Sequence, residues 1–235
     1  MLSMMQPWVS TSIYMGSLLA NETTSTLTPI EQTARFRLLG LLPLSLFLVR
    51  FLEYALIVKS PVHILWSCHI ANLTLAIGLF LVNSLMIRVA SYLLILGVLP
   101  WALDMVVIQR ITQVSLLSHI AGAGITIIVL RRIRIAPNYW QYALIFFLAL
   151  QQLTRLLTEP GPYTNINVAH HAYGAWKDLF TSYWEYWVVN TALVALALWL
   201  IESILFRIFP IREGKCEEGL RATLYDRRAK IWSRY

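Results

Sequence analysis

Six stretches of about 20 mostly apolar residues constrain this chain more than any other feature. They run over Leu38–Val58, Val62–Val82, Val89–Ile108, Val114–Leu130, Tyr139–Leu157 and Tyr186–Phe206. A helix needs about 20 such residues to cross a bilayer, where only helices and closed barrels satisfy their backbone hydrogen bonds. We therefore predict an all-α fold: a polytopic membrane helix bundle of about six transmembrane helices.

The composition divides the chain into one bundle with two flanks. Of the 235 residues, 58% are hydrophobic and 13% charged, about half the charged share of a soluble domain. Residues 1–34 are predicted to form an N-terminal interfacial segment, because Gln6 and Pro7 interrupt its apolar part. Residues 35–207 form the transmembrane bundle, and 208–235 a basic cytoplasmic tail.

The distribution of basic residues predicts the orientation. Placing both termini in the cytoplasm puts fourteen of the nineteen Lys and Arg residues on the inner side and four on the outer side. Cytoplasmic loops of membrane proteins carry such an excess. The net charge of +7 is thereby assigned to membrane topology, and we do not expect nucleic-acid binding. The sequence does not identify the membrane.

Polar residues inside the predicted spans gather toward the outer side. Such residues are costly in lipid, so they face the protein interior and often indicate a functional site. With the predicted orientation, the following residues fall in the outer half of the bilayer: Arg50, Glu53, Cys68, His69, Asn72, Asp104, His119, Arg155 and Glu159. Arg50 and Glu53 are three residues apart and are expected to pair with each other or with Asp104.

The segment from Thr158 to Tyr183 joins the last two spans on that same side. It is long for a connection and contains Asn165, Asn167, His170 and His171. Long polar loops are often functional. We expect this loop to cover an outward-facing cavity.

One interpretation of this cluster is nucleophilic acyl chemistry. Cys68 and His119 lie on different helices at similar depth. A thiol deprotonated by a histidine attacks an acyl carbonyl and holds the acyl group as a thioester. Asn72, one turn from Cys68, is placed to orient the histidine or to donate to an oxyanion.

Two other interpretations remain open. His69 and His119 on facing helices have the ligand type of a b-type haem, although the spans lack a second histidine pair. The adjacent His170 and His171 do not suit zinc. Alternatively, the polar residues only tie helices together, for about 0.6 kcal/mol each, with Gly122 and Gly124 on a close-packing face. That interpretation leaves the clustering on one side unexplained.

Several short motifs resemble a known family. They are Cys68-His69 early in a span, Leu117-Ser118-His119 two spans later, Leu157-Thr158-Glu159 leading to Asn165-Ile166-Asn167, and Gly174-Ala175-Trp176. Their order over residues 60–190 is similar to that of the transmembrane acyltransferase family that includes the human ether-phospholipid acyltransferase and bacterial YwaF-like integral membrane proteins. His63 stands five residues before Cys68, where the family has a histidine two before, and Ala175 replaces its proline.

The resemblance implies Cys68 as the acyl-carrying nucleophile and His119 as its base, with His69, Asn72, Asn165 and Asn167 as substrate-binding, oxyanion or supporting residues. It also places the chain near the fatty-acid-ester hydrolases of the androgen-induced family. We expect a lipid acyltransferase or ester hydrolase that opens to the outer leaflet and needs neither metal nor cofactor. Its expected partners are membrane lipid and an acyl lipid substrate.

The alternative is a non-catalytic membrane subunit of a larger complex. The basic tail, which also contains Trp232 and Tyr235, suits docking to a protein partner. The same tail also suits attraction to anionic lipid.

Overall fold

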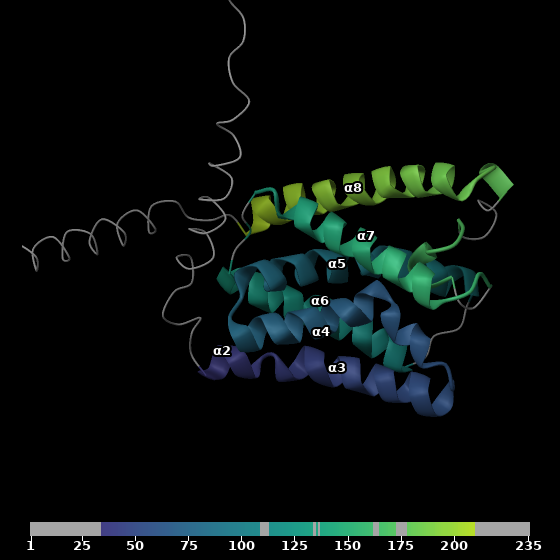
Figure 1. Cartoon of the computed structure of the whole chain (residues 1–235). Helices are drawn as coiled ribbons and strands as arrows, with labels where there is room; N and C mark the ends of the chain where they lie inside the picture. The colour runs from purple at the N-terminus through teal and green to yellow at the C-terminus, as the bar shows by residue number, and fades with distance from the viewer. Residues whose placement is uncertain are drawn as a thin grey trace, which may run out of the picture.

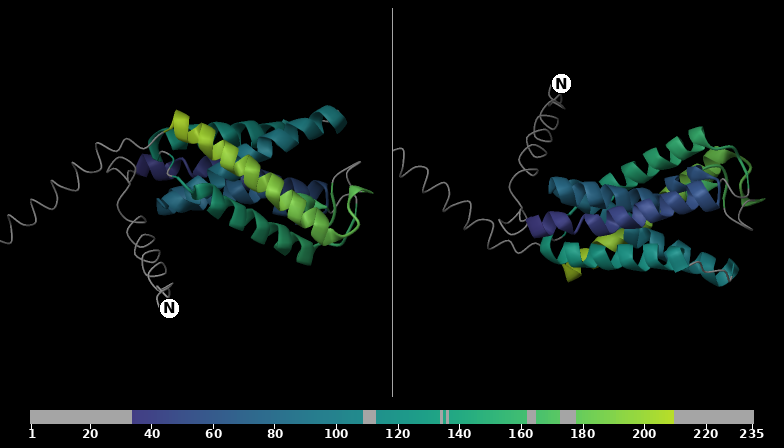
Figure 2. Two further views of the ribbon diagram at one scale, coloured as in Figure 1. Left: turned by 90° about the horizontal axis from the view of Figure 1, so that it is seen from above. Right: turned by 90° about the horizontal axis from the view of Figure 1, so that it is seen from below.

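The computed structural model describes residues 34–108, 113–133, 135, 137–161, 165–172 and 178–209. The predicted interfacial segment and basic tail therefore lie almost wholly outside the described residues. The described chain is helical, and its long helices run along one common direction with connections at both ends (Figure 1, Figure 2). The all-α prediction is confirmed.

The helices follow one another as a series of hairpins. Short helices α2 (Ala34–Leu38) and α3 (Leu41–Leu52) continue into the π-helical turn η1 (Glu53–Ile57). The remaining elements are η2 (Pro61–Leu65), α4 (Ser67–Leu81), α5 (Ser84–Ile108), α6 (Gln113–Ile133), α7 (Tyr139–Leu157), η3 (Ile166–Val168) and α8 (Tyr183–Ile208).

Within the described residues, four helical stretches are long and apolar enough to cross a membrane: Ala34–Ile57, Ser84–Leu103, Gln113–Ile133 and Tyr183–Ile208. Helix α4 is apolar but has only 15 residues, a length of about 22 Å at 1.5 Å per residue. Helix α7 has 19 residues and contains three glutamines and an arginine. Both nevertheless lie alongside the four longer stretches (Figure 1).

The predicted boundaries agree best where a residue with non-helical backbone flanks the helix. Tyr139–Leu157 matches α7 at both ends, because Asn138 adopts a left-handed conformation before it. The start of α5, predicted at Val89, lies five residues earlier, at Ser84. The start of α4, predicted at Val62, lies five residues later, at Ser67. There Pro61–Leu65 forms a 3₁₀ turn, and the extended backbone of Trp66 (ψ 133°) separates it from α4.

Helix α4 is the central element. It packs against α2, α3, α5 and α6, and its buried side chains include Leu75 and Leu79. At Gly78, an added Cβ would lie 3.0 Å from the side chains of Met86 and Ile87, so a larger residue here would require α5 to shift. Because neighbours surround α4, its polar residues His69 and Asn72 are removed from lipid and solvent.

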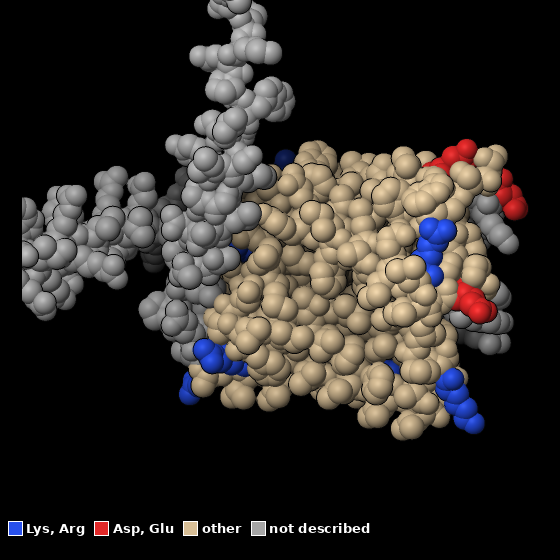
Figure 3. Space-filling model, viewed as in Figure 1, with Lys and Arg blue, Asp and Glu red and all other residues tan. Residues whose placement is uncertain are grey.

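The exterior of the bundle is apolar. Large hydrophobic side chains such as Leu56, Leu156 and Val188 are more than half exposed. On the face shown in Figure 3, charged side chains gather at the two ends, and a broad uncharged belt separates them. Such a belt suits hydrocarbon, since exposed apolar surface of this extent is rare on soluble monomers.

At the end opposite Cys68, a carboxylate ties three helices together. Glu202 of α8 accepts hydrogen bonds from the backbone N–H groups of Asn138 (2.7 Å) and Trp140 (2.9 Å) at the start of α7. It also accepts one from the hydroxyl of Tyr92 on α5 (3.0 Å). Glu202 therefore replaces a local N-cap for α7.

Candidate functional site

An ion pair lies where α3 passes into η1. Arg50, which is buried, donates to the Glu53 carboxylate (Nη1–Oε2 2.5 Å) and to the Tyr54 hydroxyl. The predicted pairing of Arg50 with Glu53 is confirmed; the side chain of Asp104 lies outside the described part. The π-helical turn matters here because widened turns of this kind occur frequently at functional sites.

Tyr54 connects this ion pair to His69 on α4. Its hydroxyl lies 3.2 Å from Nε2 of His69, and the two ring centroids are 5.6 Å apart. Because the Tyr54 oxygen already accepts from Arg50, its own proton is available for Nε2. That arrangement makes Nε2 the acceptor and leaves the hydrogen of the neutral imidazole on Nδ1.

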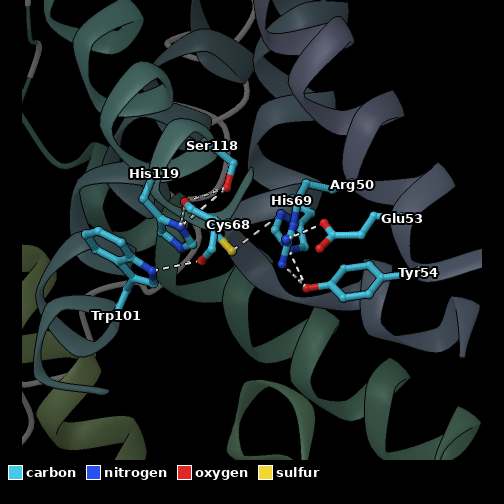
Figure 4. A network of polar contacts seen from close by, with 9 residues as sticks. Arg50, Glu53, Tyr54, Cys68, His69, Trp101, Ser118 and His119 are labelled. Carbon is cyan, nitrogen blue, oxygen red and sulfur yellow. Dashed lines mark hydrogen bonds and ion pairs between the residues drawn. The ribbon is translucent and has the colours of Figure 1, made fainter. Parts of the chain in front are cut away.

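Cys68 is the second residue of α4, and its thiol faces Nδ1 of His69 at 3.7 Å. A Cβ placed on Gly97 of α5 would lie 3.6 Å from Cβ of Cys68. The thiol therefore sits between the first turn of α4 and α5. In Figure 4 its sulfur is seen between the imidazoles of His69 and His119.

His119 comes from the second turn of α6. Its Nδ1 lies 2.9 Å from the carbonyl oxygen of Ser115, which can only accept, so Nδ1 carries the proton and Nε2 keeps a free lone pair. Trp101 stacks on the imidazole, with centroids 4.7 Å apart and planes 9° apart, and donates from Nε1 to Ser115 Oγ. Together these contacts fix the plane of the ring.

The two histidines meet edge to face, with ring centroids 6.4 Å apart. The hydrogen bond of the thiol is with His69, and none joins it to His119 among the described residues. The structure thus brings Cys68, His69 and His119 into one cluster. Pairing of Cys68 with His119 as its base stays a prediction.

Asn72 holds the first turn of α4 rather than pointing a donor at the thiol. Its Nδ2 donates to the carbonyl of Cys68 (2.9 Å). Its Oδ1 is buried without a hydrogen-bond partner in the described structure and faces α6, where a Cβ on Gly122 would lie 3.1 Å away. One of the two Nδ2 hydrogens is thus engaged by Cys68, and Oδ1 is an unused acceptor.

The loop asparagines have different partners. Asn165 closes a local turn: its Oδ1 accepts from the backbone of His170 and His171, and its Nδ2 donates to the carbonyl of His171. Asn167 reaches the beginning of α4, where its Oδ1 accepts from the backbone N–H of Ser67 (2.7 Å). The Gly174-Ala175-Trp176 stretch lies outside the described residues.

His170 anchors the same loop to the end of α7. Its Nε2 lies 2.7 Å from the hydroxyl of Thr158, which donates to the carbonyl of Thr154. Burial, and after it the positive charge of Arg155, holds the pKa of His170 below its usual 6.5. The imidazole is therefore neutral at pH 7 and donates from Nε2–H to Thr158.

Three residues that contact this cluster were not singled out from the sequence: Tyr54, Ser115 and Trp101. Tyr54 had a usable signal, because it is four residues after Arg50 and so lies on the same helix face. Ser115 has the same relation to His119. The stacking of Trp101 depends on how α5 packs against α6, which no spacing within one helix indicates.

The surroundings of His69 do not favour haem ligation. Its two ring nitrogens face Tyr54 and Cys68, so an iron ligand bond would displace one of these partners. The described residues contain no group of three His, Cys, Asp or Glu side chains placed to hold a metal ion. A small depression of about 180 Å³ lies beside Pro137 and Glu202, at the end of the bundle opposite Cys68. The cavity expected over Cys68 stays a prediction.

Comparison with known proteins gives no match: no protein-family model matches the chain, no curated protein matches its sequence, and no solved structure matches its fold.

Proposed function

We propose that this chain is a membrane-embedded thiol acyltransferase or ester hydrolase that acts on a lipid, with Cys68 as the nucleophile. The observation that carries the proposal is the placement of the Cys68 thiol between two imidazoles with different hydrogen-bond partners (Figure 4). The resemblance of the Cys68-His69 and Leu117-Ser118-His119 motifs to the transmembrane acyltransferase family supports the same residues.

The two histidines suit two different tasks. His69 presents Nδ1–H to the sulfur, which stabilises a thiolate. His119 has its free lone pair on Nε2 and is the group that takes the thiol proton. A thiolate is poorly tolerated in an apolar setting unless a partner of this kind is present. Catalytic hydrogen bonds are often long without substrate and shorten in the complex.

The proposed reaction proceeds in two steps. First, the thiol proton moves to His119 while the sulfur attacks the acyl carbonyl of a lipid ester; the leaving alcohol takes that proton, and a thioester remains on Cys68. Second, an acceptor hydroxyl or water gives its proton to His119 and attacks the thioester. The products are a new ester or a free acid, and His119 returns the proton to the thiol.

For the topology we propose six spans, with α4 and α7 as the two additional ones and both termini in the cytoplasm. Support comes from the position of α4 and α7 alongside the four longer stretches. The excess of basic residues on one side of the proposed topology supports the orientation. The Cys68 cluster then lies toward the outer leaflet.

The proposal is tested by alkylation and acylation of single-cysteine protein. With Cys216 replaced by serine, Cys68 is the one remaining thiol. We expect an iodoacetamide probe to label it at near-neutral pH, and His119→Ala to slow labelling by about tenfold or more, the range of a lost general base. Incubation with acyl lipid should give a hydroxylamine-sensitive adduct that Cys68→Ser lacks.

His171→Ala is the matched control, because its ring contacts Asn165 and Ala172 and not the cluster. It should label at the parent rate. If Cys68 stays inert while Cys216 in the parent is labelled, the enzyme proposal is abandoned. A non-catalytic membrane subunit then becomes the better interpretation, and Arg50, Tyr54 and His69 are a structural network.

A further inference from the structure

Asn167 joins the loop after α7 to the beginning of α4, one hundred residues earlier in the chain. Its Oδ1 accepts from the backbone N–H of Ser67 at 2.7 Å. Its Nδ2 donates to the carbonyl of Leu65 at 2.7 Å and to the Thr154 hydroxyl at 3.1 Å. Every hydrogen-bonding position of this amide except a second lone pair is thus used, and the side chain is buried.

The backbone around Asn167 is arranged for this contact. Asn167 has φ 55°, in the left-handed region that asparagine tolerates better than most residues. Gln151 of α7, fully buried, donates from Nε2 to the carbonyls of Asn167 and Val168 (both 3.2 Å). Tyr186 of α8 donates to the same Val168 carbonyl (2.7 Å). Helices α7 and α8 therefore fix the position from which Asn167 reaches α4.

The contact falls beside the proposed nucleophile. Helix α4 begins after Trp66, which provides no side-chain cap. The first backbone N–H of the helix, that of Ser67, would lack an intrahelical partner. Asn167 supplies the missing acceptor from another part of the chain, and the next residue is Cys68. The bond to Leu65 holds the residues just before this turn at the same time.

We propose that Asn167 is a positioning residue for the Cys68 thiol: it caps the first turn of α4 from the loop and so sets the thiol against the two imidazoles. This inference rests on the proposed function, and it extends that function by assigning control of thiol reactivity to the 165–172 loop. Asn167 acts through Ser67 and Leu65 and does not contact the sulfur.

The test compares Asn167→Ala and Asn167→Asp with His171→Ala in the Cys216→Ser chain, purified in lipid nanodiscs. His171→Ala is the matched control, since the ring of His171 bonds only to Asn165 and Ala172 of its own loop among the described residues. The first readout is hydrogen exchange of peptides that cover residues 63–70. Asn167→Ala should speed exchange there, and Asn167→Asp should retain protection, because an oxygen still accepts from Ser67 N–H.

The second readout is the rate of Cys68 alkylation as a function of pH. In Asn167→Ala the rate near neutral pH should fall about tenfold relative to the alkaline plateau, the size expected for loss of a helix N-terminal hydrogen bond. The plateau itself should stay unchanged, since it reports access. A merely structural loss would alter plateau and neutral rates together. His171→Ala should stay within about twofold of the parent on the same scale.

The outcomes separate the two proposals. Equal exchange and equal pH profiles in Asn167→Ala and His171→Ala would overturn the role of Asn167 and leave the proposed function standing. If Cys68 does not react in the parent chain, the proposed function is ruled out, and so is the control of thiol reactivity by Asn167. The exchange measurement then still decides whether Asn167 caps α4.

Discussion

At the scale of single residues, the site depends on which hydrogen-bond partner each polar atom has. His69 and His119 are the same residue type at similar depth, yet a tyrosine hydroxyl binds Nε2 of one and a backbone carbonyl binds Nδ1 of the other. The first arrangement presents an N–H toward the thiol, and the second leaves a lone pair free. His69 therefore presents a hydrogen-bond donor and His119 an acceptor, although the two side chains are identical.

Gly122 and Gly124, expected together on a close-packing face, are in different surroundings. A Cβ on Gly122 would lie 3.1 Å from Oδ1 of Asn72 and 3.4 Å from Leu94, whereas nothing lies within 4 Å of one on Gly124. A methyl group at Gly122 would therefore crowd its neighbours, whereas one at Gly124 would not. Residues two apart point to different sides of a helix, but that spacing does not indicate which of the two faces a neighbouring helix.

This difference gives a prediction for a matched pair of variants. Gly124→Ala should raise the melting temperature or leave it unchanged, because alanine is favoured over glycine in a helix by about 1 kcal/mol. Gly122→Ala should lower it, because the new methyl group crowds Asn72. Thermal unfolding in detergent measures both. Equal melting temperatures for the two variants would show that Asn72 moves aside without cost.

At the scale of helices, the length of an apolar stretch predicts that a helix exists and approximately where it ends. It does not predict the local geometry at those ends. The match of α7 at Tyr139 and Leu157 and the late start of α4 at Ser67 both follow from turn conformations. Pro61 and the extended backbone of Trp66 determine where α4 begins. Depth alone indicated that Cys68, His69 and His119 would lie near one another. It could not predict the contact of Asn167 with Ser67, which depends on a left-handed loop residue.

Glu202 provides a prediction at this scale. Glu202→Ala removes the acceptor of two backbone N–H groups at the start of α7 and of the Tyr92 hydroxyl. Buried donors left unpaired cost about 1–3 kcal/mol each, so the melting temperature should fall clearly, and Glu202→Gln should fall less because it keeps one acceptor oxygen. Ser203→Ala is the control, since among the described residues Ser203 bonds to its own helix, at the carbonyl of Trp199. A melting temperature of Glu202→Ala equal to that of Ser203→Ala would contradict the proposed tie.

At the scale of the whole molecule, the two ends of the bundle differ. One end contains Glu202 tied to the backbone of α7. The other contains the Arg50, Cys68 and His119 cluster and the loop that Asn167 anchors to α4. The described structure thus separates a structural tie from the candidate site by roughly the length of a helix, about 30 Å for 20 residues.

The orientation of these ends in a membrane is the last prediction. Arg131 and Arg132 in the last turn of α6 and Arg207 in the last turn of α8 lie at the Glu202 end, whereas the 165–172 loop lies at the other. If the positive end is cytoplasmic, a single cysteine at Pro137 should react with an impermeant maleimide only after the membrane of sealed cells is opened. A cysteine at Asp178 should react in intact cells. Both substitutions are made in a chain with Cys68 and Cys216 replaced by serine, so that labelling reports position alone. The opposite pattern would place the cluster toward the cytoplasmic leaflet and leave its internal geometry unchanged.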